Sequence, residues 1–136
     1  MVFDPKYEPE YESLKTLLLE MPREHAVGPL LDLIVRQLAG RPHVALARLR
    51  LIKEGDCQCP LHEPACDEHG KCLHLMASCG HSRFDTQADW SRLDGAFSRF
   101  PIGSRKVGWI AASGEAVEVQ DIEKDAVWIA RPEWAR

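Results

Sequence analysis

The sequence lacks the long apolar segments of a membrane protein. No apolar run approaches the roughly 20 residues that a helix needs to cross a bilayer. Residues 1–15 are acidic and interrupted by proline, whereas a secretory leader is basic at first and then apolar. We therefore expect a cytoplasmic protein with no membrane partner.

Blocks of basic residues are also missing. The 17 lysines and arginines are scattered among 21 acidic residues, which gives a net charge of -4 at pH 7. Proteins that follow a phosphate backbone or an anionic membrane surface carry clustered positive charge. This balance argues against nucleic acid as a direct partner.

Recognisable catalytic motifs are missing as well. The sequence contains no GxSxG, no HExxH and no glycine-rich phosphate loop. The glycines from Gly103 to Gly114 are better explained as residues that start and stop a helix. Asp85, Asp89 and Asp94 are scattered along a polar stretch, which is typical of a solvated loop. We expect that the chain is not an enzyme, and we assign no catalytic residue.

Cysteine is absent from most of the chain and concentrated in one stretch. Cys57, Cys59, Cys66 and Cys72 lie in a segment interrupted by proline and glycine, whereas Cys79 lies in an apolar run. In a reducing compartment such residues are thiols or metal ligands, and an odd number fits poorly with a fully paired disulfide framework. Cys79 is expected to be a buried core thiol.

The first four cysteines could hold one metal ion or an iron–sulfur cluster. Cys57 and Cys59 point the same way in an extended segment, and Cys66 and Cys72 would close the site across the loop. Structural zinc sites usually begin with two cysteines separated by at least two residues, and this pair is separated by one. Reversible thiol redox chemistry and inert loop thiols are the alternatives, and a histidine of the loop could replace a cysteine.

The hydrophobic pattern predicts one α+β domain, in keeping with a length of 136 residues. Apolar residues at helical spacing predict a short helix that ends near Pro22, and a second that opens with Gly28 and Pro29 and stops at Gly40. Ser104 predicts the start of a third helix, which Gly114 would end. Alternating patterns predict strands at residues 44–52, 72–80, 97–102 and 116–122.

The first two predicted strands form an antiparallel pair, with the cysteine segment as a long connection between them. Alternation places Arg48 and Arg50 together on one face of the first strand. On the second strand it separates two sets of side chains. One face carries Leu73, Leu75, Ala77 and Cys79, and the other carries Cys72, His74, Met76 and Ser78.

Four stretches of the sequence are similar to segments of a known domain family. They are LLDLIVRQLAGRPHVALARLRLI at 30–52, CLHLMASCG at 72–80, FPIGSRKVGWIAASGEAVEVQDI at 100–122 and DAVWIARPEWAR at 125–136. Together they resemble a GAF domain over residues 25–136, preceded by a leader and short helix at 1–24. The cysteine loop before a CLHL strand is similar to a subset at the N-terminus of bacterial signalling proteins, including enhancer-dependent transcription activators and histidine kinases.

The resemblance implies an antiparallel sheet with helices on one face and a ligand pocket on the other. In such domains two further strands and a closing helix follow a PEWA-like stretch, whereas this sequence stops at Arg136. We therefore expect a C-terminally incomplete sheet whose open edge favours a homodimer.

The resemblance also implies a regulatory sensor that binds a small molecule and controls an attached or interacting output domain. The matching positions for the ligand are His74, Arg99, Arg105 and Trp109. In the alternative interpretation Trp109 belongs to the core and the two arginines are solvated. Other functions left open are a thiol redox enzyme similar to the free methionine sulfoxide reductases, with Cys72 as nucleophile, and a structural zinc module for dimerisation.

Overall fold

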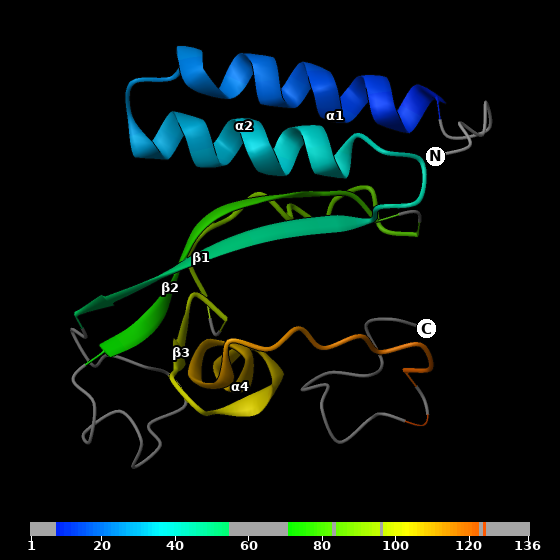
Figure 1. Ribbon diagram of the computed structural model, residues 1–136. Coiled ribbons are helices and arrows are strands. Elements are labelled where there is room, and N and C mark those ends of the chain that lie inside the picture. Colours follow the sequence, from blue (N-terminus) through cyan, green and yellow to red (C-terminus); the bar gives the residue numbers. More distant parts are fainter. Residues whose placement is uncertain (1–7, 55–70, 83, 96, 123, 125–136) are drawn as a thin grey trace. The chain divides into compact units, whose positions relative to one another are not determined.

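The computed structural model describes residues 8–54, 71–82, 84–95, 97–122 and 124 (Figure 1). It confirms the α+β class, with three α-helices, a short 3-10 helix and a three-stranded antiparallel sheet on which helix α2 packs. No helix in the described ranges is both long and apolar enough to span a bilayer.

The first helices form a hairpin. Helix α1 spans Glu8–Glu20, the 3-10 helix η2 spans Met21–Arg23, and α2 spans Val27–Ala39. Helix α1 starts before Pro9 and takes up most of the stretch 1–24, which the sequence divided between a leader and a short helix. Gln37 Nε2 donates to Glu20 Oε2 at 3.3 Å and ties the two helices together.

Helix α2 ends at Gly40, as predicted, but it begins two residues earlier than Pro29 suggested. Ala26 is the extended residue before its first turn. A proline is tolerated at the third helical position because the backbone N–H groups of the first turn have no partner within the helix. Pro29 alone therefore does not fix the first residue of the helix, because proline is tolerated at any position of the first turn.

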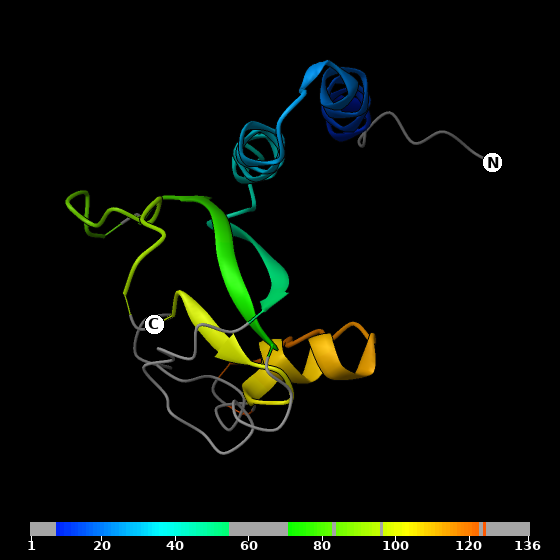
Figure 2. The same cartoon turned by 90° about the vertical axis from the view of Figure 1, so that its left-hand side faces the viewer.

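Three of the four predicted strands are present. They are β1 at Leu46–Glu54, β2 at Lys71–Gly80 and β3 at Arg99–Pro101. Strand β2 lies between the other two (Figure 2). The antiparallel register of β2 and β3 places Cys72 opposite Pro101, Leu73 opposite Phe100 and His74 opposite Arg99.

The strand predicted at residues 116–122 is wrong, because this segment has no regular secondary structure. Its alternating side chains, with Val117 and Val119 on one side, are compatible with a strand. A strand also needs a neighbour for its backbone hydrogen bonds. In the described ranges the sheet consists of β1, β2 and β3, and the segment at 116–122 pairs with none of them.

Helix α4, Arg105–Ser113, follows β3 directly. Gly114 ends it in a left-handed conformation with φ of 73°, as the sequence predicted. Ser104 stands at the predicted N-cap position, but its side chain makes no capping hydrogen bond. A side chain at Gly108 would collide with the carbonyl oxygen of Pro101, so the absence of a Cβ lets the helix lie against the end of β3.

The chain divides into two compact units, Met1–Arg50 with Leu75–Leu93, and Leu51–His74 with Asp94–Arg136. Each has its own buried side chains. Those of the first unit include Leu17, Val35, Ala39, Leu75 and Ala77, and those of the second include Cys72, Leu73 and Phe100.

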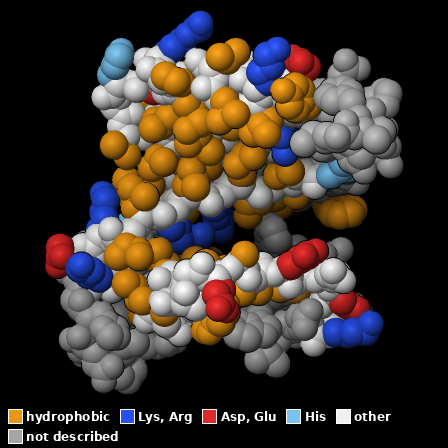
Figure 3. Space-filling view, viewed as in Figure 1, with side chains coloured by type: hydrophobic (Ala, Val, Ile, Leu, Met, Phe, Trp, Pro, Cys, Tyr) orange, Lys and Arg blue, Asp and Glu red, His pale blue; other side chains and the backbone are white. Residues whose placement is uncertain are grey.

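The helical hairpin of the first unit leaves apolar side chains in solvent. Figure 3 shows a continuous apolar surface over α1 and α2. The exposed large apolar side chains of these two helices are Tyr11, Leu14, Leu18, Leu19 and Val27.

Candidate functional site

Strand β2 is the most deeply buried element of the sheet. Its apolar residues Leu73, Leu75 and Ala77 are joined by two buried polar side chains, His74 at 8% and Ser78 at 4% exposure. A polar group in such a place must find a hydrogen-bond partner, because its desolvation is otherwise uncompensated. The partners of these groups define the candidate sites.

His74 contacts Cys72 on the same face of the strand, as alternation predicted. Cys72 Sγ and His74 Nε2 lie 3.3 Å apart, and the thiol is fully buried. A proton can be shared between sulfur and imidazole in this arrangement. The same two atoms would lie about 3.5 Å apart as ligands in a tetrahedral zinc site. The contact is thus compatible with thiol chemistry and with metal binding.

Arg99 is the cross-strand neighbour of His74, so their side chains leave the sheet on the same face. Its Nη1 donates to the carbonyl oxygen of Ser98 at 3.1 Å, and its side chain is half-buried. On the opposite face Phe100 stacks on Phe97, with ring centroids 6.0 Å apart. The stacked rings brace the short strand that carries Arg99.

Arg105 and Trp109, the other two predicted ligand-binding residues, lie on α4. They are four residues apart, which places them on one side of the helix. Arg105 is exposed and has a φ of 53°, in the left-handed region that residues other than glycine rarely occupy. Trp109 is half-buried. The structure therefore brings Cys72, His74 and Arg99 together on two strands and places Arg105 and Trp109 on the following helix.

The predicted four-cysteine centre is represented here by Cys72 alone. Cys57, Cys59 and Cys66 lie outside the described residues, so that centre stays a prediction. Within the described ranges no three histidine, cysteine, aspartate or glutamate side chains form a metal-binding group.

The prediction that Cys79 is a buried core thiol is wrong. Cys79 is half-exposed, although Leu75 and Ala77 on the same face are buried. The reason is its position one residue from the end of β2, where burial falls off along the strand.

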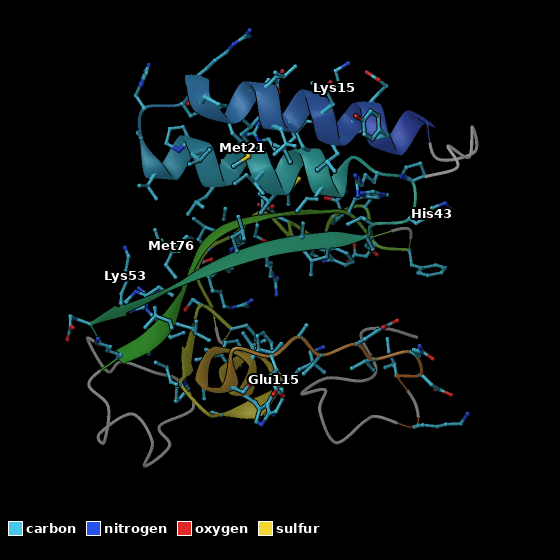
Figure 4. All side chains as sticks on the ribbon, viewed as in Figure 1. Lys15, Met21, His43, Lys53, Met76 and Glu115 are labelled. Atoms are coloured by element: carbon cyan, nitrogen blue, oxygen red, sulfur yellow. The ribbon has the colours of Figure 1, made fainter. Side chains whose placement is uncertain are left out.

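A second polar cluster lies in the other unit and was missed as a site. Arg48 Nε donates to Ser78 Oγ at 3.2 Å, and the Ser78 hydroxyl donates to the carbonyl oxygen of Trp90. Met76, labelled in Figure 4, lies between His74 and Ser78 on this face of β2 by alternation. The signal was present in the sequence, since Arg48 and Arg50 share one face of their strand.

The surroundings of this cluster disfavour the charged form of Arg48 and of its neighbour Arg50. Loss of solvent lowers the pKa of Arg48. Burial, and secondly the charge of Arg48, lower the pKa of Arg50 to about 10. Both effects disfavour the positive charge on these two side chains in the folded protein.

Comparison with known proteins identifies no relative, since no family model, no curated protein and no solved structure matches this chain.

Proposed function

We propose that this chain is a GAF-like regulatory sensor domain of a bacterial signal-transduction or transcription-regulatory protein. It would work in the cytoplasm on an attached or interacting output domain. The α+β architecture and the familiar sequence stretches support this proposal. The single observation that carries it is the contact between Cys72 and His74 on the central strand, because it gives the domain a centre that can respond to a metal or to an oxidant.

The chemistry of this pair suits zinc or iron. A thiolate and an imidazole are ligands that both metals accept, and here they come from one rigid strand. Cys72 and His74 would supply two ligands, and two of the three predicted loop cysteines, Cys57, Cys59 and Cys66, would complete a tetrahedral site. A bound metal would remove the thiol proton and hold the imidazole neutral.

Signalling would follow from a shift between two arrangements of the domain. A ligand changes such an equilibrium only to the extent that it binds one arrangement more tightly than the other. Strand β2 is suited to this role because it lies between β1 and β3. Occupancy at Cys72 and His74 would thus act directly on the middle of the sheet.

The proposal is tested by anaerobic purification of the full chain, followed by an absorption spectrum and elemental analysis. Visible absorption with iron and sulfide indicates a cluster, and zinc without colour indicates a single-metal site. Cys72→Ser and His74→Gln should each lose most of the metal. Cys79→Ser is the matched control, since Cys79 lies on the opposite face of the same strand, and it should keep the metal. Wild-type protein without metal would contradict this form of the proposal.

The same contact supports one enzymatic alternative. A cysteine beside a histidine is the arrangement that activates a thiolate nucleophile, as a reductase of free methionine sulfoxide requires. The complete burial of Cys72 argues against it, because a substrate must reach the sulfur. Turnover of methionine sulfoxide with dithiothreitol would decide in favour of this alternative.

We also propose that a second copy of the chain covers the exposed face of α1. Tyr11, Leu14 and Leu18 are exposed by 55%, 42% and 59% and recur at intervals of three and four residues. This spacing is typical of a seam between two helices, and two identical seams match each other. Sedimentation of the wild type should show a dimer, whereas Leu18→Glu should sediment as a monomer. Lys15→Glu, a change beside the seam, should remain dimeric.

A further inference from the structure

The N-terminus of helix α4 carries a buried hydroxyl group that has no hydrogen-bond partner in the described part of the chain. This is Oγ of Ser104, a residue that is 5% exposed and stands at the N-cap position. Both of its backbone groups are bonded, since its N–H donates to the carbonyl oxygen of Pro101 at 3.2 Å and its carbonyl oxygen accepts from Gly108 at 2.9 Å. Ser104 is therefore fixed at the first turn of the helix.

The conformation of Ser104 directs its side chain to the open end of the helix. Its φ of -90° and ψ of 134° are extended, and an N-cap side chain in this conformation lies beside the N–H groups of the first turn. A serine there normally accepts one of these protons, but Ser104 does not. Because a buried polar group without a partner is costly, the hydroxyl indicates a ligand that supplies the missing hydrogen bond.

The first turn of α4 also concentrates positive charge. Arg105 and Lys106 are its first two residues, and it has no acidic side chain. The ion pairs formed among the described residues include neither of these cations. The helix dipole already makes its N-terminus positive, so cations are unfavourable there and an anion is favourable.

The end of α4 is held against the strand before it. Gly103 N–H donates to the carbonyl oxygen of Gly108 at 2.8 Å, and the close approach of Gly108 to Pro101 leaves no room for a Cβ. The first-turn N–H groups, which have no partner within the helix, are thus fixed in direction. Donors that are fixed in advance lose less freedom when they bind a ligand.

We propose that the N-terminus of α4 binds a phosphate group. The first-turn N–H groups and the Ser104 hydroxyl would donate to its oxygens, and Arg105 and Lys106 would balance its charge. Helix N-termini bind such anions because their N–H groups and dipole point at the ligand. A phosphate group carries about two negative charges at neutral pH and so matches two cations. The role of this ligand as a signal rests on the proposed sensor function, but the binding itself does not.

The binding is tested on the full chain by NMR titration. Potassium phosphate is added at constant pH and ionic strength, with potassium chloride as the reference salt. The backbone amide signals of Arg105, Lys106 and Val107 should shift in a saturable way. The amide signal of Gly114 should not, because its N–H lies at the other end of the helix and donates to Ile110 at 2.9 Å. Unchanged first-turn signals would overturn the proposal.

A serine variant then tests the hydroxyl. Ser104→Ala should weaken phosphate binding about tenfold, the loss expected for a hydrogen bond to a charged group. Ser113→Ala is the matched control at the other end of α4, where the exposed hydroxyl accepts from Glu115 N–H at 3.1 Å, and it should bind as the wild type does. In phosphate-free buffer Ser104→Ala should not lower the denaturation midpoint. A lowered midpoint with unchanged phosphate affinity would show an ordinary N-cap and overturn the proposal.

A lysine variant tests the charge. Lys106→Gln should weaken phosphate binding by about two- to fivefold, the effect of one charge near the protein surface. Lys124→Gln is the control, because Lys124 is exposed and pairs with Asp121 at 2.9 Å, and it should keep the wild-type affinity. Equal affinity in the two variants would overturn the proposal.

Further probes identify the ligand class and separate this site from the metal centre. Tighter binding of glycerol 3-phosphate than of inorganic phosphate supports an organic phosphomonoester, and equal binding supports recognition of the phosphate alone. Preference for acetate over both would overturn the assignment to phosphate. Cys72→Ser should still bind phosphate even if it binds no metal. Loss of phosphate binding in this variant, with the fold intact, would place the anion at the metal centre and overturn the assignment to α4.

Discussion

Strands β1 and β2 are neighbours in one sheet, yet polar residues are buried on β2 and remain partly or fully exposed on β1. Strand β2 buries His74 and Ser78 and satisfies each with a partner close at hand. Strand β1 has no fully buried residue and carries its charges in half-buried or exposed positions. The difference follows from position, since β2 has a strand on each side and β1 lies at the end of the described sheet. Polar groups that hydrogen-bond to each other can be buried on the central strand, whereas cations remain at the edge strand, where solvent reaches them.

Leucine-to-alanine substitutions should give the largest difference in unfolding free energy between the two strands. Leu73→Ala on β2 removes a side chain that is 5% exposed and should cost about 3 kcal/mol of unfolding free energy through lost burial and a cavity. Leu51→Ala on β1, in the same unit, removes a half-buried side chain and should cost about 1 kcal/mol. Urea denaturation measures both. Equal losses would show that β1 is buried as deeply as β2.

A smaller effect is expected where the two strands meet through a hydroxyl. Ser78→Ala removes the group that joins Arg48 to the Trp90 carbonyl oxygen and should cost about 1–2 kcal/mol. Ser98→Ala is the matched control, because its hydroxyl donates to Gly95 in an exposed turn at 2.8 Å, and it should cost less than about 0.5 kcal/mol. Both values come from the denaturation midpoint at constant slope. No change in the unfolding free energy of Ser78→Ala would mean that the hydrogen bonds of Ser78 do not hold Arg48 in place.

The features of this comparison that the sequence predicted are local ones. Alternation put Cys72 and His74 on one face of a strand, and the structure confirms it because side-chain direction repeats every two residues whatever surrounds the strand. Gly114 ended α4 as predicted, because the left-handed conformation favours glycine at that point. Both conclusions needed only a few neighbouring residues.

The features that sequence reasoning missed depend on distant residues. The bond between Arg48 and Ser78 joins positions 30 apart and requires a register between strands that no local pattern fixes. The strand predicted at 116–122 failed for the same reason, since alternation indicates which face is apolar but does not supply a partner. The half-exposed Cys79 likewise reflects where burial ends along β2, which its apolar neighbours alone did not indicate.

The smallest effect is expected from the charge on the edge strand, and its sign is opposite to the others. Arg50→Met should raise the unfolding free energy by about 1 kcal/mol or less at pH 7 in phosphate-free buffer, since it removes a half-buried cation beside Arg48. Solvent screening of the half-buried group keeps the gain small. Arg36→Met, at an exposed ion pair, should give no gain.

The pH dependence gives this prediction its sharpest form. Burial, and secondly the charge of Arg48, lower the pKa of Arg50 to about 10, so the folded state loses this proton more readily than the unfolded state does. The penalty from the cation is therefore fully present well below pH 10 and decreases as pH rises through about 10 towards the higher pKa of the unfolded state. The difference in stability between Arg50→Met and the wild type should shrink when denaturation is repeated at pH 10.5 instead of pH 7, by roughly a few tenths of a kcal/mol. A stability difference that grows with pH would mean that the folded protein stabilises the positive charge of Arg50. The charged group of β1 would then have a favourable partner, as the buried polar groups of β2 do.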